Sequence, residues 1–174
     1  CVRKGQKDLV QAMSVLKDSA ATKVRLFIVG DRPSLYSSEM NKMVASLPGE
    51  RAARISIVPE TEKTALYYSA ADIFVCTSRV ESYPRVILEA MAYGLPIIST
   101  PVFGTLEQVR EQVNGEFYES GNVAQLASKI ENLILDQSKR DLYRRNAPFV
   151  LESLPGFDEM VRRYAEVFNE SAAT

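Results

Sequence analysis

The sequence contains no histidine, no tryptophan and only two cysteines among its 174 residues. The lack of histidine excludes catalytic triads and metal sites that depend on an imidazole. Two cysteines are too few for a disulfide framework, and Cys76 lies in an apolar run that predicts burial. We therefore expect both thiols to be free.

An excess of one charge and long apolar runs are also missing. The net charge of −1 gives no electrostatic attraction to nucleic acid or to an anionic membrane. One short stretch is rich in basic residues, which we interpret as a solvated helical face. These residues are Lys139, Arg140, Arg144 and Arg145. No window approaches the roughly 20 apolar residues of a membrane span, and no secretory signal is visible. We expect a cytoplasmic protein with no nucleic-acid partner and no indication of membrane association.

The pattern that is present is an alternation of strands and helices. The chain is 46% apolar and long enough for one well-packed domain. Short apolar runs alternate with amphipathic segments, which favours an α/β fold: a doubly wound, Rossmann-like parallel sheet with helices on both faces. The predicted strands cover 24–29, 55–58, 73–76 and 117–118, and a further strand follows Gly94.

The stretch 71–100 predicts one βαβ unit. An apolar run is followed by a polar turn, by a helix that Pro84 opens and Gly94 ends, and by a second apolar run. Glu89 is the only charged residue between Val86 and Ile98, so we expect it among apolar neighbours, where a carboxylate needs a partner. Glu81 lies in the loop after the first strand, at the edge where parallel sheets bind ligands.

Each glutamate also has a plain structural interpretation. Glu89 could be a half-exposed helix residue paired with Arg85 one turn earlier, a contact worth a few tenths of a kcal/mol, about 0.2–0.5. Glu81 could be an ordinary solvated loop carboxylate, and the residues alone favour that interpretation. The spacing by itself therefore leaves the role of both residues open.

The segment ESYPRVILEAMAYGLPIIST at 81–100 resembles the E-x7-E signature of retaining glycosyltransferases with two Rossmann-like domains, the GT-B fold. The resemblance covers the strand, both glutamates, the E-A-M-A-x-G-x-P run and the following strand. It implies that Glu81, the catalytic-site residue, accepts hydrogen bonds from the hydroxyls of the donor sugar. It implies that Glu89 accepts them from the ribose of the donor nucleotide.

Other positions match the same family. Lys4, in a Lys-Gly pair, corresponds to a lysine that contacts the donor diphosphate, and Gly30 lies in a turn where the backbone approaches the donor. Two helix starts would offer amide groups to the diphosphate. The substrate-binding residues there are Tyr83, Pro84, Arg85 and Val86 at one start, and Gly104 and Thr105 at the other. The chain departs from the family pattern at Arg32, Phe103 and Leu106.

The resemblance implies one donor-binding domain over 1–174, the C-terminal half of a GT-B enzyme. We expect its first strand and the N-terminal acceptor-binding domain to lie upstream in the full-length chain. Transfer would proceed from a nucleoside-diphosphate sugar with retention and without a metal or other cofactor, and this part alone would be inactive. The alternatives are a non-catalytic nucleotide-binding or protein-interaction module, and a sugar-nucleotide epimerase. The sequence names neither the sugar, the base nor the acceptor.

Overall fold

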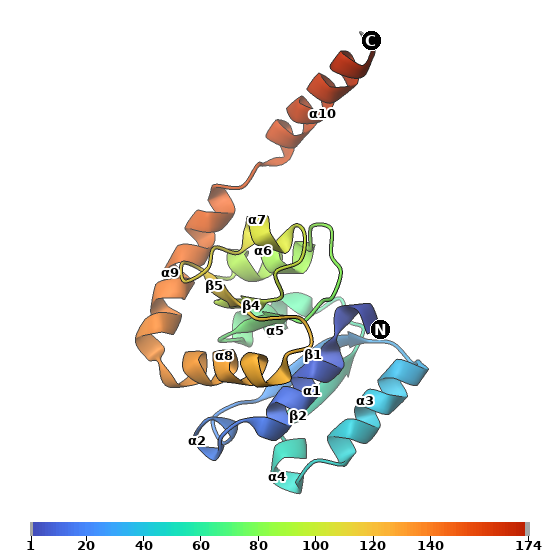
Figure 1. Cartoon of the computed structure of the whole chain (residues 1–174), viewed down its shortest axis with the longest axis vertical. Helices are drawn as coiled ribbons and strands as arrows, with labels where there is room; N and C mark the ends of the chain where they lie inside the picture. Colours follow the sequence, from blue (N-terminus) through green and yellow to red (C-terminus); the bar gives the residue numbers. More distant parts are fainter. Residues whose placement is uncertain (1, 173–174) are drawn as a thin grey trace.

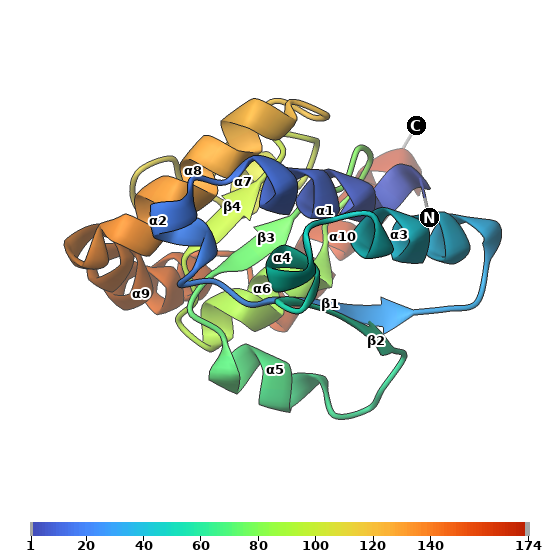
Figure 2. The same cartoon turned by 90° about the horizontal axis from the view of Figure 1, so that it is seen from below.

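The computed structural model describes residues 2–172, in which parallel strands lie between layers of helices (Figures 1 and 2). The strands are β1 (Leu26–Asp31), β2 (Ile55–Pro59), β3 (Phe74–Cys76), β4 (Ile97–Ser99) and β5 (Gly115–Phe117). The helices are the 3-10 turn η1 (Val2–Lys4), α1 (Gln6–Val15), α2 (Asp18–Ala21), α3 (Leu35–Ala45), α4 (Gly49–Ala52), α5 (Thr64–Ala70), α6 (Arg85–Ala92), α7 (Thr105–Gln108), α8 (Val123–Leu135), α9 (Gln137–Glu152) and α10 (Phe157–Ala172).

The strands form two hydrogen-bonded sheets within a single domain. Their orders are β1-β2 and β3-β4-β5, and every pair is parallel. Ile28 of β1 and Ile98 of β4 are buried in one apolar cluster with residues of α1 and α8. Ile97 packs on the opposite side in a second cluster, with Ile87 of α6 and Ala147 of α9. Helices therefore cover both faces, and the predicted Rossmann-like α/β fold is confirmed.

The ends of several helices follow from their sequences. Ser34 and Asn122 cap α3 and α8 by accepting hydrogen bonds from Ser37 N–H and Gln125 N–H, at 3.1 and 3.0 Å. Gly94 has φ +68°, and Leu95 N–H donates to Ala90 O at 3.0 Å, which is the Schellman ending predicted for α6. Pro84 stands one residue before the first helical residue, so α6 begins at Arg85 rather than at the proline.

Helix α10 extends away from the rest of the chain (Figure 1). Tyr164, Val167 and Phe168 on this helix are 61%, 59% and 70% exposed, as expected for an apolar face that nothing in the described chain covers. Across residues 2–172, every helix falls short of the length and apolar character that crossing a membrane requires.

Candidate functional site

The segment 3–5 is held against the carboxyl end of β3. Arg79 N–H donates to Arg3 O at 2.7 Å, and Thr77 Oγ1 donates to Lys4 O at 2.7 Å. Gly5 has φ +64°, and a Cβ there would lie 2.2 Å from Thr77 O. Only glycine permits both this backbone conformation and this approach. The Lys-Gly pair therefore fixes where the Lys4 side chain emerges.

Lys4 and Glu81 form an ion pair beside this strand end, and Ser78 Oγ donates to the same Glu81 oxygen at 2.8 Å. The Glu81 residue is 9% exposed, whereas the Lys4 side chain is 37% exposed. Burial opposes ionisation of Glu81, but the hydrogen bonds from Lys4 and Ser78 and the charges of Lys4 and Arg3 outweigh it and lower the pKa of the carboxyl. The site therefore holds a buried carboxylate that is charged at neutral pH.

The burial of the two glutamates decides between the alternatives left open for them. Glu81, predicted at a solvated loop, is buried, whereas Glu89, predicted among apolar neighbours, is half-buried. The partner of Glu89 is Tyr68 of α5, whose hydroxyl donates to Glu89 Oε2 at 2.9 Å. Within residues 2–172, Arg85 and Glu89 form no ion pair, so the pairing considered for them is wrong.

Tyr68 is fixed in place by the stacking of its ring on Tyr93, at 5.5 Å between ring centroids. Burial raises the pKa of the Tyr68 hydroxyl, and the hydrogen bond to Glu89 raises it further. The phenol therefore stays protonated at neutral pH and donates to the Glu89 carboxylate.

The loop after β4 contacts the loop that carries Glu81. Gly104 N–H donates to Ser82 O at 2.9 Å, and a Cβ on Gly104 would lie 2.0 Å from that oxygen and 2.8 Å from the Tyr83 ring. The buried Gln108 Nε2 donates to Pro84 O at 3.3 Å. Both loops are thereby fixed at the start of α6.

These contacts contradict one expectation about the loop after β4. Its amides were expected to be free for a ligand, but Gly104 N–H donates to Ser82 O and Thr105 N–H donates to Val102 O at 3.0 Å. Thr105 Oγ1 also donates to Thr100 O at 2.7 Å, so this residue shapes the loop from within. The helix start with exposed first residues is that of α6.

The start of α6 is the open part of the site. Arg85 and Val86 are exposed and occupy the first turn, where helix amides have no partner within the helix. Pro84 has no side chain that could cap them. Tyr83 is 40% exposed beside them, and burial and then the charge of Glu107 raise the pKa of its phenol, opposed by a hydrogen bond from Gln108. This surface offers donor groups next to the ionised Glu81.

Gly30 lies on the other sheet, at the carboxyl end of β1. It has φ +93°, and the register with β2 shifts between Val29 and Asp31, so Gly30 forms a bulge. The residue is exposed, and a Cβ there would meet nothing within 4 Å. Among the described residues, no hydrogen bond joins Gly30 to Lys4 or Glu81, and its approach to a donor stays a prediction.

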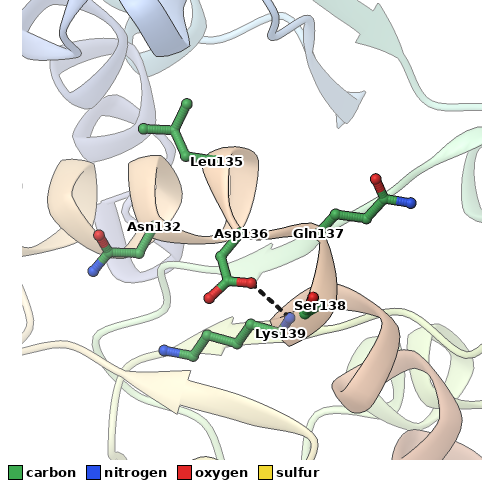
Figure 3. A pocket seen from close by; sticks show the side chains of 6 residues that line it. All are labelled: Asn132, Leu135, Asp136, Gln137, Ser138 and Lys139. Carbon is green, nitrogen blue, oxygen red and sulfur yellow. Dashed lines mark hydrogen bonds between the residues drawn. The ribbon is translucent and has the colours of Figure 1, made fainter.

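Two hollows in the surface of the described chain are lined by other residues. The larger has a volume of about 450 Å³ at the junction of α8 and α9 (Figure 3), and it is lined by Asn132, Leu135, Asp136, Gln137, Ser138 and Lys139. Lys139 pairs with the buried Glu116, and Arg140 donates to Ile134 O at 2.7 Å, so these two side chains contact the fold. Arg144 and Arg145 are exposed, as expected for a solvated helical face. A smaller hollow of about 340 Å³ borders Pro101 and Val102, just before Gly104.

Sequence reasoning missed three residues of the site. Ser78 precedes Glu81 by three positions, and this short separation in the sequence is the one local signal of their contact. The Tyr68 hydroxyl donates to Glu89, and the Thr77 hydroxyl donates to the Lys4 carbonyl. Both contacts join residues that lie far apart in the sequence. Nothing in their local sequence marks those contacts.

Comparison with known proteins places the chain among glycosyltransferases. Residues 2–149 match the family described as glycosyl transferases group 1. The capsular polysaccharide biosynthesis glycosyltransferase CapM of Staphylococcus aureus is 27% identical over 143 residues, which cover 82% of this chain and 37% of CapM. The GDP-mannose:cellobiosyl-diphosphopolyprenol alpha-mannosyltransferase of Xanthomonas oryzae is 28% identical over 171 residues, 95% of this chain and 44% of the relative.

Solved structures agree. Anabaena Alr3699/HepE in complex with UDP superposes with a TM-score of 0.85 at 25% identity, over 98% of this chain and 46% of HepE. A glycosyltransferase from Rickettsia africae superposes with a TM-score of 0.83 at 25% identity, over 97% of this chain and 44% of the other. The chain spans less than half the length of each of these four proteins. The chain belongs to the group 1 glycosyl transferase family.

Proposed function

We propose that this chain is the donor-binding domain of a glycosyltransferase that moves a sugar from a nucleoside-diphosphate sugar to an acceptor. The observation that carries the proposal is the buried, ionised Glu81, held by Lys4 and Ser78 beside the exposed start of α6. Relatives named as glycosyltransferases and a similar structure in complex with UDP support the same conclusion.

The roles follow from the chemistry of the donor. An ionised carboxylate accepts hydrogen bonds only, so Glu81 suits sugar hydroxyls and Glu89 suits the ribose hydroxyls. Lys4 is more exposed than Glu81 and its ammonium has further donors, so it can contact the diphosphate while it pairs with Glu81. The first amides of α6 and its positive dipole end would hold the second charge of the diphosphate. Gly104 and Thr105 act by shaping the loop that packs on this start.

Transfer in this proposal proceeds with retention and without a metal. The leaving phosphate takes the proton of the acceptor hydroxyl, so this domain supplies orientation and charge stabilisation rather than a base. The acceptor binds an N-terminal domain of the same full-length chain, and the present residues alone transfer no sugar. Retention is tested by the anomeric configuration of the product of the full-length enzyme, and the metal by the rate in EDTA.

Calorimetric titration with UDP-, GDP- and ADP-sugars tests donor binding directly. One donor gives a binding heat, and replacing Glu89 with Ala removes a hydrogen bond to a charged group, worth about 1.5–3 kcal/mol. The affinity should therefore fall about tenfold or more. Glu62→Ala is the matched control, because Glu62 is exposed at the surface before α5.

The opposite outcome is equally clear. If none of the three donors gives heat, the chain is better described as a non-catalytic module of the same fold. If Glu62→Ala weakens binding as much as Glu89→Ala, the assignment of Glu89 to the ribose is wrong.

A further inference from the structure

Apolar side chains are exposed around the buried Glu81. Phe103, in the loop after β4, is 70% exposed, and Leu106 of α7 is 56% exposed. Val80 and Tyr83, which lie on either side of Glu81 in the sequence, are 50% and 40% exposed. We call these four residues the apolar rim. The roles proposed above depend on charges and amides, and they give the apolar rim no function.

The apolar rim spans the two loops that flank the start of α6. Gly104 N–H donates to Ser82 O at 2.9 Å, and a Cβ on Gly104 would lie 2.8 Å from the Tyr83 ring. Phe103 precedes Gly104, so its backbone lies directly beside the loop that carries Glu81. Helix α7 begins one residue after Gly104 and lies beside α6 (Figure 1). The apolar rim and the carboxylate therefore border one region of the surface.

The backbone of Phe103 adopts an unfavourable conformation. Its φ of +41° lies in the left-handed region, where a Cβ crowds the backbone and glycine is the favoured residue. The turn that begins α7 holds it there, because Phe103 O accepts from Leu106 N–H at 3.1 Å. Packing of the ring offsets little of this strain, since most of the residue is exposed. Strained residues of this kind cluster at ligand sites.

Phe103 and Leu106 are also positions at which this chain departs from the pattern of its family. The apolar rim is therefore a feature of this chain, and it suits a choice that this chain makes among ligands.

The size and chemistry of the apolar rim favour a sugar. A stable protein interface involves about 20–30 residues on each side, whereas the rim has four. A hexose carries hydroxyl groups around its edge and C–H groups on its two faces. The hydroxyls match the ionised Glu81, which only accepts hydrogen bonds. A C–H face matches an aromatic ring, because the negative face of the ring attracts the slightly positive hydrogens.

We propose that the apolar rim, and Phe103 above all, binds the C–H face of the sugar that the donor carries. This inference rests on the proposed function, in which Glu81 binds the hydroxyls of the same sugar. Sugars differ in which hydroxyls are axial, and an axial hydroxyl interrupts the C–H face from which it projects. The apolar rim therefore contributes to the choice among sugars, and Phe103 is a specificity-determining residue.

Calorimetric titration separates the sugar from the rest of the donor. The probes are UDP-glucose, UDP-galactose, UDP-N-acetylglucosamine, GDP-mannose and ADP-glucose, together with UDP, GDP and ADP, which carry no sugar. Phe103→Gly should weaken the sugar nucleotide that the parent binds most tightly by about tenfold. The affinity for the matching diphosphate should stay unchanged, because the diphosphate does not reach the apolar rim.

Three controls separate a lost contact from a disturbed structure. Phe103→Tyr keeps the aromatic ring and should retain the affinity for the sugar nucleotide. Gln112→Gly makes the same backbone change at φ +60°, in the exposed turn before β5, and should leave every affinity unchanged. In thermal unfolding, the Tm of Phe103→Gly should not fall, because glycine adopts a positive φ without strain. Its loss of affinity then comes from the missing ring and not from unfolding.

The outcomes also distinguish this inference from the proposed function. The inference is overturned if Phe103→Gly leaves the tightest sugar nucleotide unchanged, or if it weakens the matching diphosphate equally. It is also overturned if Phe103→Tyr weakens the sugar nucleotide as much as Phe103→Gly does. A chain that binds diphosphates but no sugar nucleotide overturns it as well, while the diphosphate site remains supported. A chain that binds none of these compounds contradicts the proposed function itself, and the inference with it.

Discussion

Replacement of Gly104 by Ala tests how the two loops of the site are coupled. The added methyl carbon would lie 2.0 Å from Ser82 O and 2.8 Å from the Tyr83 ring. The carbonyl belongs to the backbone, so it cannot turn away as a flexible side chain would. One of the two loops must move, and the hydrogen bond from Gly104 N–H to Ser82 O is then lost.

The size of the effect can be worked out from these contacts. Overpacking of a well-packed site costs about 1–3 kcal/mol, and the lost hydrogen bond adds about 0.5–1.5 kcal/mol. The free energy of unfolding should therefore fall by about 1.5–4.5 kcal/mol. For a chain of this length each kcal/mol corresponds to about 2–4 °C in Tm, so we expect Tm to fall by about 3–18 °C.

Calorimetric unfolding compares this variant with Gly49→Ala. Gly49 is the first residue of α4, it is exposed, and a Cβ there would meet nothing within 4 Å. Its replacement should change the free energy of unfolding by less than about 0.5 kcal/mol. Donor affinity is measured on both variants at a temperature where both are folded, and only Gly104→Ala should weaken it, because Ser82 leads into the start of α6.

Equal stability of the two variants would refute the reasoning. It would mean that the loops do not approach as closely as the Gly104–Ser82 hydrogen bond requires. A destabilised Gly104→Ala variant with unchanged donor affinity would keep the packing argument but would separate this loop from the donor site.

Three further replacements probe the charged groups. In Glu81→Gln, the stability advantage of the parent should be present above pH 4.5 and lost below it, because the pKa of Glu81 is lowered from its ordinary value of 4.5 on folding. Urea unfolding at pH values between about 3 and 7 measures the difference in free energy of unfolding between the parent and the variant on both sides of that pKa. A difference that does not change with pH would contradict the prediction. Lys4→Met should raise the pKa of Glu81, since burial then acts with less opposition, as a carbon-13 NMR titration of the carboxyl would show. Tyr68→Phe should lower the free energy of unfolding by about 1 kcal/mol, through loss of the hydrogen bond to Glu89, and an unchanged urea midpoint would count against that contact.

Local sequence was sufficient for the main strands and helices and for some of their ends, although α6 begins at Arg85 rather than at Pro84. The apolar runs and amphipathic segments predicted the strands and helices, because those periods are properties of neighbouring residues. The stop at Gly94 and the caps at Ser34 and Asn122 depend on one turn of backbone each. The division into two sheets could not be predicted in the same way, because strand pairing joins residues far apart in the chain.

The site was predictable as a set of positions but not as a set of environments. The family signature located Lys4 and Glu81, and the structure joins them in one ion pair. The burial of the two glutamates was left open, because the apolar sequence neighbours of a helical residue can occupy its other faces. Glu89 lies on a face of α6 that meets Tyr68, whereas Glu81 lies in a loop beside the turn that carries Lys4.

The failed prediction for the loop after β4 has a general physical reason. A helix start binds an anion only if its first amides are not already paired with the preceding loop. In α7, which has a single turn, Thr105 N–H and Leu106 N–H donate to Val102 O and Phe103 O. In α6, Ile87 N–H donates to Pro84 O, but Arg85 and Val86 precede it on an exposed surface. A donor diphosphate would therefore bind at α6 and Lys4, and the loop after β4 would contribute to diphosphate binding only by holding that start in place.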